Sequence, residues 1–173
     1  MNRDMLHNQI FDSAGNVLYT YAAHWVIVDR LVKRYKRIKI AQIVLTALST
    51  GGFLTSVMAG VEWLGWVGGL SSSVALGLNL YTLNFNEVET IKKHTEAANE
   101  LWDIREAYRS LLVDFSGLSD EEIRAKRDEL MAAVGKVNKN YPGTDAKSIS
   151  QAQKDIEKYS FSKGESEKLF NNS

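Results

Sequence analysis

The sequence predicts an all-α membrane protein: a transmembrane helical hairpin with long amphipathic cytoplasmic helices that form a coiled helical bundle and associate into an oligomer. Two observations indicate this fold class. The 47 residues from 40 to 86 carry one charge, Glu62, whereas about a third of the other 126 residues are charged, above the roughly 25% usual in soluble chains. Apolar residues on both sides of this block recur at helical spacing.

Two uncharged segments occupy residues 40–61 and 63–85, with lengths of 22 and 23 residues. As helices they would each be about 33–35 Å long, enough to cross a hydrocarbon core of about 30 Å. Only Glu62 separates them, and Gly60 and Gly65 favour a tight turn there. The segments therefore predict a hairpin that brings both ends of the chain to the same side of the membrane.

Basic residues before the first segment set the predicted orientation. This cluster consists of Arg30, Lys33, Arg34, Lys36, Arg37 and Lys39. Since the turn carries no basic residue, both termini are expected on the cytoplasmic side of the membrane, with Trp63 and Trp66 at the outer interface and Tyr81 and Phe85 at the inner one. The alternative is a soluble protein that buries the hairpin among its other helices.

Small residues recur every four positions in both segments. They are Ala47, Gly51, Thr55 and Ala59 in the first and Gly65, Gly69, Ser73 and Gly77 in the second. Small residues at this spacing let helix backbones approach closely in lipid. They predict helix packing, either within the hairpin or between subunits.

Uncharged polar residues form a second set within the two segments. They are Gln42, Thr46, Ser49 and Ser56 in the first and Ser72 and Asn79 in the second. A simple anchor does not need them, but they would be satisfied if they faced water or other subunits. We therefore expect these residues to line a pore or a seam in a homo-oligomer, with helix packing alone as the alternative.

Residues 1–39 predict an N-terminal amphipathic helix that ends in the basic cluster. Its apolar stripe consists of Leu18, Tyr21, Trp25, Val28, Val32 and Tyr35. The run Asp-Ser-Ala-Gly-Asn at residues 12–16 predicts a break, so the helix is expected to begin near Val17. His24, beside Trp25, is interpreted as a packing residue.

Residues 87–160 predict a second helical region. The a and d positions of its first heptads are Ile91, His94, Ala98, Leu101, Arg105, Tyr108, Leu112 and Phe115. His94 and Arg105 interrupt this apolar seam and are interpreted as register or pairing residues. The run 119–122 predicts a capping box that starts a helix reaching about Asn138, followed by a turn at 141–144 and a short helix over 145–159. The polar tail, 161–173, is expected to be disordered.

The sequence contains no pattern typical of catalysis. His7, His24 and His94 are far apart in the sequence and fit no metal-ligand spacing, and cysteine is absent. Phosphate-binding loops and nucleophile motifs are absent as well. We therefore expect no enzyme activity, no cofactor and no metal site. The net charge of zero argues against direct binding of nucleic acid.

Two stretches of the sequence are similar to a known family. The run YAAHWVIVDRLVKRYKRIKIAQIVLTALSTGGFLTSV resembles the first helix and first span of the SLATT domains, the SMODS- and SLOG-associating two-transmembrane effectors of bacterial conflict systems. The run ANELWDIREAYRSLLVDF, followed by a helix and an NYPGTD turn, is similar to their cytoplasmic coiled region. The likeness covers about residues 17–156.

The resemblance implies a membrane effector of an antiphage, abortive-infection system that oligomerises and permeabilises the inner membrane as a signal-gated pore. Its partners would be the lipid bilayer, further copies of the chain, and either a cyclic oligonucleotide or a neighbouring nucleotide synthase, sensor or reverse transcriptase. The candidate contacts for an anionic nucleotide are Lys92, Lys93, Arg105 and Arg109, with Trp102 for stacking. A solvated helix surface is the alternative interpretation of these five residues.

The sequence therefore leaves two functions open. The first is the gated pore. The second is a non-conducting membrane scaffold whose cytoplasmic coil recruits a partner protein.

Overall fold

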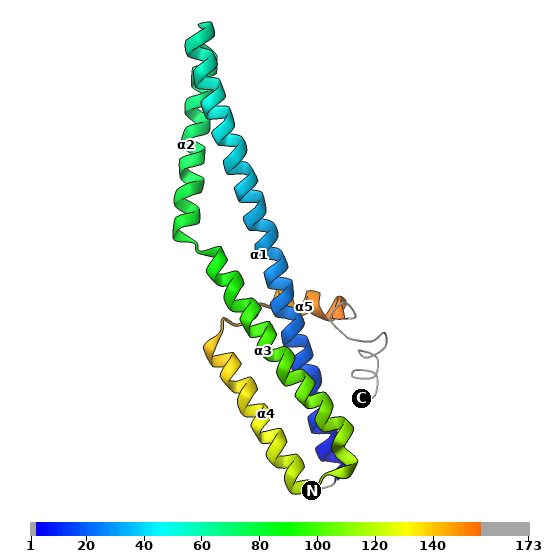
Figure 1. The fold of residues 1–173 in the computed structure, drawn as a ribbon. Helices are drawn as coiled ribbons and strands as arrows, with labels where there is room; N and C mark the ends of the chain where they lie inside the picture. Colours follow the sequence, from blue (N-terminus) through cyan, green and yellow to red (C-terminus); the bar gives the residue numbers. More distant parts are fainter. Residues whose placement is uncertain (1–2, 157–173) are drawn as a thin grey trace. The chain divides into compact units, whose positions relative to one another are not determined.

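A computed structural model of the chain describes residues 3–156, and all regular structure in that range is helical (Figure 1). The elements are α1 (Arg3–Ala59), α2 (Glu62–Asn84), α3 (Glu87–Asp114), the short 3-10 helix η1 (Phe115–Gly117), α4 (Asp120–Asn140) and α5 (Ala146–Lys154). They form two compact units. We call the described residues before 30 and after 90 the helical bundle, and residues 30–90 the hairpin unit.

The first helix, α1, runs without interruption over 57 residues. The break predicted at residues 12–16 is therefore wrong. Buried apolar residues continue at 3-4 spacing through this stretch, namely Leu6, Ile10, Ala14 and Val17. Gly15 costs a helix about 1 kcal/mol relative to Ala. Burial of the surrounding apolar face outweighs this local preference, because helix stability in proteins comes mainly from packing.

The apolar faces of α1, α3 and α4 form the core of the helical bundle. Its buried members are Leu6, Ile10, Ala14, Val17, Ala97, Leu101, Ile104, Tyr108, Leu111, Ile123 and Val137. A second cluster packs α5 against α1, with Leu18, Ala22, Ala23, Ala152 and Ile156. Of the predicted heptad positions on α3, those from His94 to Tyr108 are buried, whereas Ile91, Leu112 and Phe115 are half-buried.

The helix α4 begins with the predicted capping box. The Ser119 hydroxyl accepts the backbone N–H of Glu122 at 3.3 Å, and the Glu122 carboxylate accepts the backbone N–H of Ser119 at 2.8 Å. Asp145 caps α5 by accepting the backbone N–H of Ser148 at 2.7 Å. The tail expected to be disordered, 161–173, lies outside the described residues.

A two-residue connection, Gly60 and Val61, joins α1 to α2. Gly60 has a φ angle of 68°, in the left-handed region that glycine adopts without steric cost. This conformation reverses the chain, so α2 returns alongside the second half of α1 (Figure 1).

The two helices of the hairpin unit approach each other most closely at Gly52 and Gly68. A Cβ atom on Gly52 would lie 2.9 Å from the carbonyl oxygen of Leu64, and one on Gly68 would lie 3.1 Å from the carbonyl oxygen of Ser49. Both distances are shorter than ordinary van der Waals contact, so a Cβ atom at Gly52 would force the backbone to shift, and one at Gly68 would need a shift of a few tenths of an ångström. Close packing of this kind is how helices associate in lipid, where the hydrophobic effect does not drive one helix against another.

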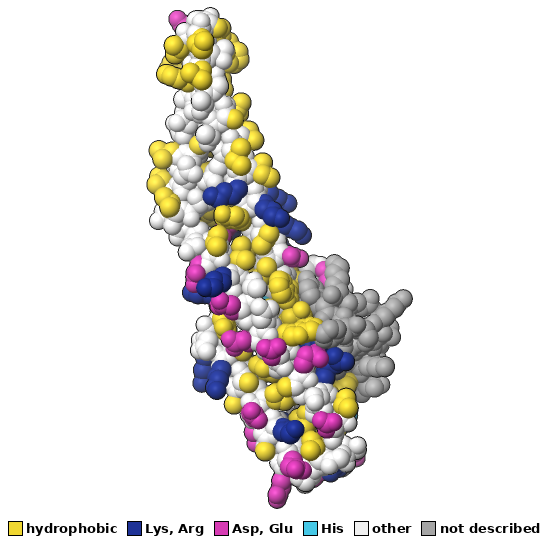
Figure 2. All heavy atoms as spheres, in the orientation of Figure 1, with side chains coloured by type: hydrophobic (Ala, Val, Ile, Leu, Met, Phe, Trp, Pro, Cys, Tyr) yellow, Lys and Arg dark blue, Asp and Glu magenta, His cyan; other side chains and the backbone are white. Residues whose placement is uncertain are grey.

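Between the basic cluster and the turn at Gly60, and back along α2, large apolar side chains are exposed on the surface of the hairpin unit (Figure 2). Its exposed large hydrophobic residues are Ile40, Ile43, Val44, Leu48, Phe53, Leu54, Val57, Met58, Trp63, Trp66, Leu70, Val74, Leu76, Leu80, Leu83 and Phe85. Among the described helices, α1 is the one that is long and apolar enough to cross a membrane, and α2 does not meet this measure. A soluble protein would need to cover this surface, and the structure leaves it exposed.

The glycine contact gives a test of the hairpin packing. Gly52→Ala or Gly68→Ala should lower the free energy of unfolding of the purified protein in detergent by about 1–3 kcal/mol, because the added methyl group meets backbone atoms that must shift. Circular dichroism at 222 nm during heating measures the change.

Gly51→Ala and Gly69→Ala are matched controls, because each adds the same methyl group one residue away, where no described atom beyond the glycine's own helical turn lies within 4 Å. In detergent that holds the chain as a monomer, these two variants should be as stable as the parent protein or slightly more so, since Ala favours a helix over Gly. An equal loss of stability in all four variants would contradict the contact.

Candidate functional site

A polar contact joins α1 and α2 inside the apolar hairpin unit. Gln42 Nε2 donates to Asn79 Oδ1 at 2.8 Å and lies 3.4 Å from the hydroxyl of Thr82. The Gln42 side chain is buried. An amide without a partner is costly in hydrocarbon, and here the Gln42 nitrogen and the Asn79 oxygen are paired within one chain.

The other residues predicted to line a pore or to pack fall into two groups. Ser49, Ser56 and Gly65 lie with Gln42 where α1 faces α2, with the Ser56 hydroxyl 3.0 Å from the position of a Cβ atom on Gly65. Exposed on the helix surfaces are Thr46, Gly51, Gly69, Ser72, Ser73 and Gly77, together with Asn79. A Cβ atom on Gly51, Gly69 or Gly77 would meet no described atom within 4 Å, so these glycines take no part in the contact between α1 and α2.

Hydroxyl groups on these outward surfaces bond to their own helices. Thr46 donates to the carbonyl of Gln42 and Thr55 to that of Gly51, both at 2.8 Å, and Ser73 donates to the carbonyl of Gly69 at 3.1 Å. These bonds use the hydroxyl protons, so the small-residue surfaces hold no unsatisfied donor at these positions. The oxygen lone pairs can still accept from a neighbouring helix or from water.

One polar line runs along the otherwise apolar surface of α1. A shallow hollow of about 460 Å³ follows it, lined by Lys39, Gln42, Ile43, Thr46, Ala47 and Thr50. The polar members are spaced by three or four residues and therefore share one face of the helix. A hydroxyl-lined strip of this kind is the feature of the hairpin unit best suited to contact water or a second subunit.

The helical bundle buries a pair of histidines that are 70 residues apart in sequence. The Nδ1 atoms of His24 on α1 and His94 on α3 lie 2.8 Å apart, and both side chains are less than 5% exposed. One ring must donate and the other must accept, so the accepting Nδ1 carries no proton in this arrangement. Burial and the adjacent His94 lower the pKa of His24 from 6.5 to about 4.

Arg105 is also buried inside the bundle rather than exposed to a ligand. Its Nη1 lies 2.6 Å from a carboxylate oxygen of Glu106, and its guanidinium lies 5.0 Å from the centre of the Trp102 ring. The side chain is 2% exposed. This placement agrees with a pairing residue within the helical seam, because a buried charge requires partners.

The structure distributes the five candidate nucleotide contacts along α3. Lys92, Lys93 and Arg109 are exposed. Trp102 is half-buried, and Arg105 is buried. At 1.5 Å per residue, the two lysines lie about 25 Å from Arg109 along the helix axis. They therefore cannot contact the same phosphate group as Arg109.

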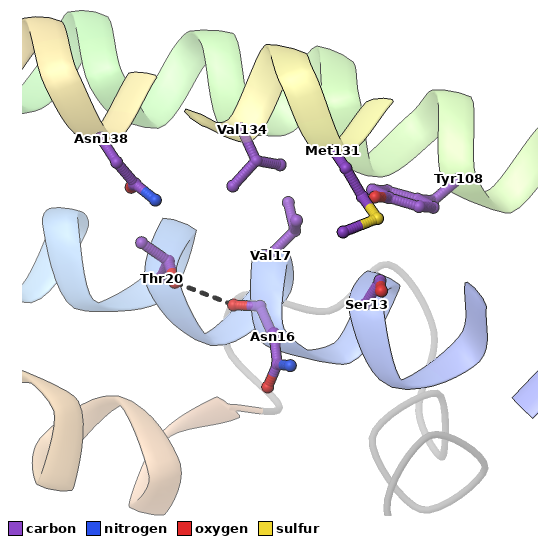
Figure 3. A pocket seen from close by; sticks show the side chains of 8 residues that line it. All are labelled: Ser13, Asn16, Val17, Thr20, Tyr108, Met131, Val134 and Asn138. Carbon is purple, nitrogen blue, oxygen red and sulfur yellow. Dashed lines mark hydrogen bonds between the residues drawn. The ribbon is translucent and has the colours of Figure 1, made fainter. Parts of the chain in front are cut away.

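Figure 3 shows a hollow of about 280 Å³ between α1, α3 and α4. It is lined by Ser13, Asn16, Val17, Thr20, Tyr108, Met131, Val134 and Asn138. Val17, Met131 and Val134 point toward one another across it (Figure 3). None of the lining residues is charged, and burial raises the pKa of Tyr108, so the lining offers no cation to a phosphate group.

The histidine pair was missed by sequence reasoning, which treated His24 and His94 as separate packing residues. Each histidine lies on one of the two apolar stripes that would pack together, and this shared position is the only sequence feature that points to a contact between them. Periodicity gives the face of a helix but not the register between two helices, so the meeting of the two rings could not be read from it.

The fold and the apolar hairpin define an α-helical protein with the features of a membrane domain. The chain belongs to the SMODS and SLOG-associating 2TM effector domain family 4, which matches residues 6–165. No curated protein and no solved structure matches it.

The family assignment confirms the resemblance to the SLATT domains. The family's description states two transmembrane segments and an effector role, and the family is not known as one of enzymes. Within the described residues, no group of three or more His, Asp or Glu side chains could hold a metal ion.

The buried histidine pair predicts that the bundle loses stability in mild acid. Below about pH 6.5 the unfolded chain binds a proton at His24, whereas the folded chain does not until about pH 4, so the free energy of unfolding falls as the pH falls through this window. Between pH 6.5 and pH 5 the loss is about 2 kcal/mol, or about 4–8 °C in melting temperature. Melting curves of the purified protein in detergent measure this dependence.

His24→Gln removes the titrating group but keeps an amide that can bond to His94. This variant should melt at a lower temperature near pH 7 and show a weaker dependence on pH. His7→Gln is the matched control, because His7 lies edge-on to Phe115 in another part of the bundle, and this variant should leave the dependence unchanged. An unchanged slope in His24→Gln would contradict the role of the pair.

Proposed function

We propose that the protein is a membrane effector of a bacterial antiphage system that oligomerises and permeabilises the inner membrane as a signal-gated pore. The family supplies the effector role and the two transmembrane segments. The observation that carries the proposal is the division of polar and small residues between two faces of the hairpin unit. One set packs α1 against α2, and the other is left exposed on an apolar surface.

The exposed set supports association between subunits. Thr46 and Thr50 lie on a surface that would otherwise meet lipid, and Gly51, Gly69 and Gly77 lie where no described atom approaches. Small residues that are not used inside the hairpin allow a second copy to pack closely, and the hydroxyl line could then face water at the centre of a ring. An anchor that only holds a protein in the membrane has no use for either feature.

The continuity of α1 supports a gating mechanism. The same helix contributes residues 3–29 to the helical bundle and residues 30–59 to the hairpin unit. A rotation or shift of α1 within the bundle must therefore be transmitted along the helix. The polar residues His24, His94 and Arg105 favour a switch there, because a seam with polar groups can adopt alternative pairings more readily than a fully apolar one.

The proposed topology follows from the basic cluster before the hairpin. Residues 1–39 and 87–160 would be cytoplasmic helices, residues 40–86 the transmembrane hairpin, and residues 161–173 a polar tail. Both termini would lie in the cytoplasm, because basic residues are retained on that side.

The proposed trigger acts on the cytoplasmic helices. It would be a cyclic oligonucleotide, or a partner protein such as a nucleotide synthase, a sensor or a reverse transcriptase encoded nearby. Lys92, Lys93 and Arg109 are exposed on α3 and could contact an extended anionic partner. Arg105 and Trp102 would act within the bundle, through the packing of α3 against α1.

The second candidate function is a non-conducting scaffold whose cytoplasmic coil recruits a partner protein. The bond between Gln42 and Asn79 favours it, because it pairs these two amides without a pore. Replacement of both spans by poly-Leu helices distinguishes the two functions. A scaffold should keep its cellular activity after this replacement, whereas a pore should lose it.

Leakage from liposomes tests the pore directly. Vesicles that hold the inserted protein and a fluorescent dye are exposed to a panel of cyclic di- and trinucleotides. We expect leakage in one of two forms. Leakage that needs a nucleotide would mean that this chain senses the trigger, and constitutive leakage would mean that a partner protein controls the opening of the pore. Thr46→Leu combined with Thr50→Leu should slow the leakage about tenfold or more, because an apolar lining raises the barrier to ions and water.

Val44→Leu combined with Leu48→Ile is the matched control. It changes exposed apolar residues on the same helix without removing a polar group, so leakage should be unchanged. The absence of leakage under every condition, from vesicles shown to contain inserted protein, would refute the pore and favour the scaffold.

A further inference from the structure

A charged hollow lies at the base of the hairpin unit, where α2 ends and α3 begins. Its volume is about 340 Å³. It is lined by Leu31, Arg34, Tyr81, Asn84, Phe85, Asn86, Glu87 and Thr90. The hollow therefore combines one cation, one anion and two aromatic rings within a single cavity, and neither the pore nor the scaffold function uses it.

The carboxylate of Glu87, at the start of α3, is buried without a hydrogen bond from the described chain. The side chain is 10% exposed, and neither of its oxygens accepts a hydrogen bond within the part of the chain that the structure describes. Arg34 Nε lies 2.9 Å from one oxygen as an ion pair, without the alignment of a hydrogen bond. The ion pair with Arg34 offsets part of the cost of burying this carboxylate, and an external cationic donor could supply the hydrogen bonds that its oxygens do not accept from the described chain.

Arg34 supplies the complementary group. Its side chain is 53% exposed, and its guanidinium lies 5.4 Å from the centre of the Tyr81 ring. Among the described residues, its outer nitrogens donate to no acceptor. A half-exposed guanidinium with free outer nitrogens is suited to a phosphate, which it can bind through two parallel hydrogen bonds.

The position of the hollow along the chain indicates where such a ligand would come from. Arg34 precedes the apolar block at Ile40 by six residues, about 9 Å along the helix. Headgroups extend several ångströms beyond the hydrocarbon core on each side of a bilayer. If the hairpin spans the membrane as proposed above, the hollow lies at headgroup depth.

We propose that this hollow binds the headgroup of a phospholipid that carries a primary ammonium, as in phosphatidylethanolamine. The phosphate would pair with the outer nitrogens of Arg34. The ammonium would donate to Glu87 beside the stacked rings of Tyr81 and Phe85, whose centres lie 4.7 Å apart. Binding exchanges the single ion pair between Arg34 and Glu87 for two charge-assisted contacts with the lipid.

This chemistry makes a prediction about lipid class. The ammonium of phosphatidylethanolamine has N–H donors for Glu87, whereas the quaternary amine of phosphatidylcholine has none. Phosphatidylglycerol has no positive charge to offset the carboxylate. We expect phosphatidylethanolamine to bind more tightly than either.

Thermal stabilisation of the full chain in detergent tests the site. Short-chain phosphatidylethanolamine at about ten times its dissociation constant should raise the melting temperature by about 3–6 °C, and phosphatidylcholine or phosphatidylglycerol at the same concentration should raise it less. Glu87→Gln should remove the preference for phosphatidylethanolamine. Arg34→Gln should weaken the effect of all three lipids.

Two variants serve as controls. Arg37→Gln removes an exposed charge from the same basic cluster, and Glu89→Gln removes an exposed charge from the same turn of α3, and both should keep the lipid preference. Native mass spectrometry of the same samples counts bound lipids, so a variant that is merely less stable is still informative.

Three results would overturn the site. These are equal stabilisation by the three lipids in the parent protein, an unchanged preference in Glu87→Gln, and an equal effect of soluble phosphoethanolamine, which would assign the hollow to a free metabolite. Failure of the site is separable from failure of the proposed function. Leakage with no lipid preference refutes the headgroup site alone, whereas extraction of the protein from vesicles by alkali refutes the membrane placement on which the site rests.

Discussion

The close approach of backbones at Gly52 and Gly68 is the constraint on which the hairpin unit depends. Because the helices approach so closely at both positions, α1 and α2 use small residues for their contact and leave their large apolar residues facing outward. In a soluble protein the large residues would form the core. The inverted arrangement is stable only where the surroundings are themselves apolar, so the glycine contact and the lipid environment depend on each other.

The helical bundle uses the first part of the same helix, α1, in a different kind of packing. There α1 buries Leu6, Ile10 and Leu18 against its neighbours, as a soluble amphipathic helix does, but it also buries His24 against His94. A fully apolar seam would be more stable. Polar groups that satisfy each other specify one register and can be disturbed by protonation or by a ligand that competes for one of them. The bundle therefore holds the part of α1 that a signal could move.

The sequence predicts the elements well where one local rule decides the outcome. The capping box at Ser119 is fixed by two residues three positions apart, and the hairpin by an uncharged block interrupted at Glu62. The prediction fails at residues 12–16, where burial on the bundle side overrides a run of weak helix formers. Local propensity differs by about 1 kcal/mol per residue, whereas burial of one large apolar side chain contributes about 1.5–3 kcal/mol.

The candidate sites were less predictable, because they depend on register between helices. The small-residue ladders were visible in the sequence, but the contact between α1 and α2 uses Gly52 and Gly68, each next to a ladder glycine that faces outward. A shift of one residue rotates the contact by about 100° around a helix. Similarly, Arg34 was recognised only as one of six basic residues, and nothing in its spacing indicated that Glu87 would lie beside it after a chain reversal.

The distribution of polar groups in the hairpin unit connects these observations. Gln42 and Asn79 are paired inside it, the hydroxyls of Thr55 and Ser73 bond to their own helices, and the charges of Arg34 and Glu87 lie at its base. Polar groups in lipid are tolerated where they are satisfied or where they reach the interface. On the hydroxyl line of α1, Thr46 donates its proton to the Gln42 carbonyl, and its oxygen lone pairs can still accept a hydrogen bond. Donors from water or from another subunit would satisfy them, which is why the oligomer, rather than the single chain, is the functional unit that we propose.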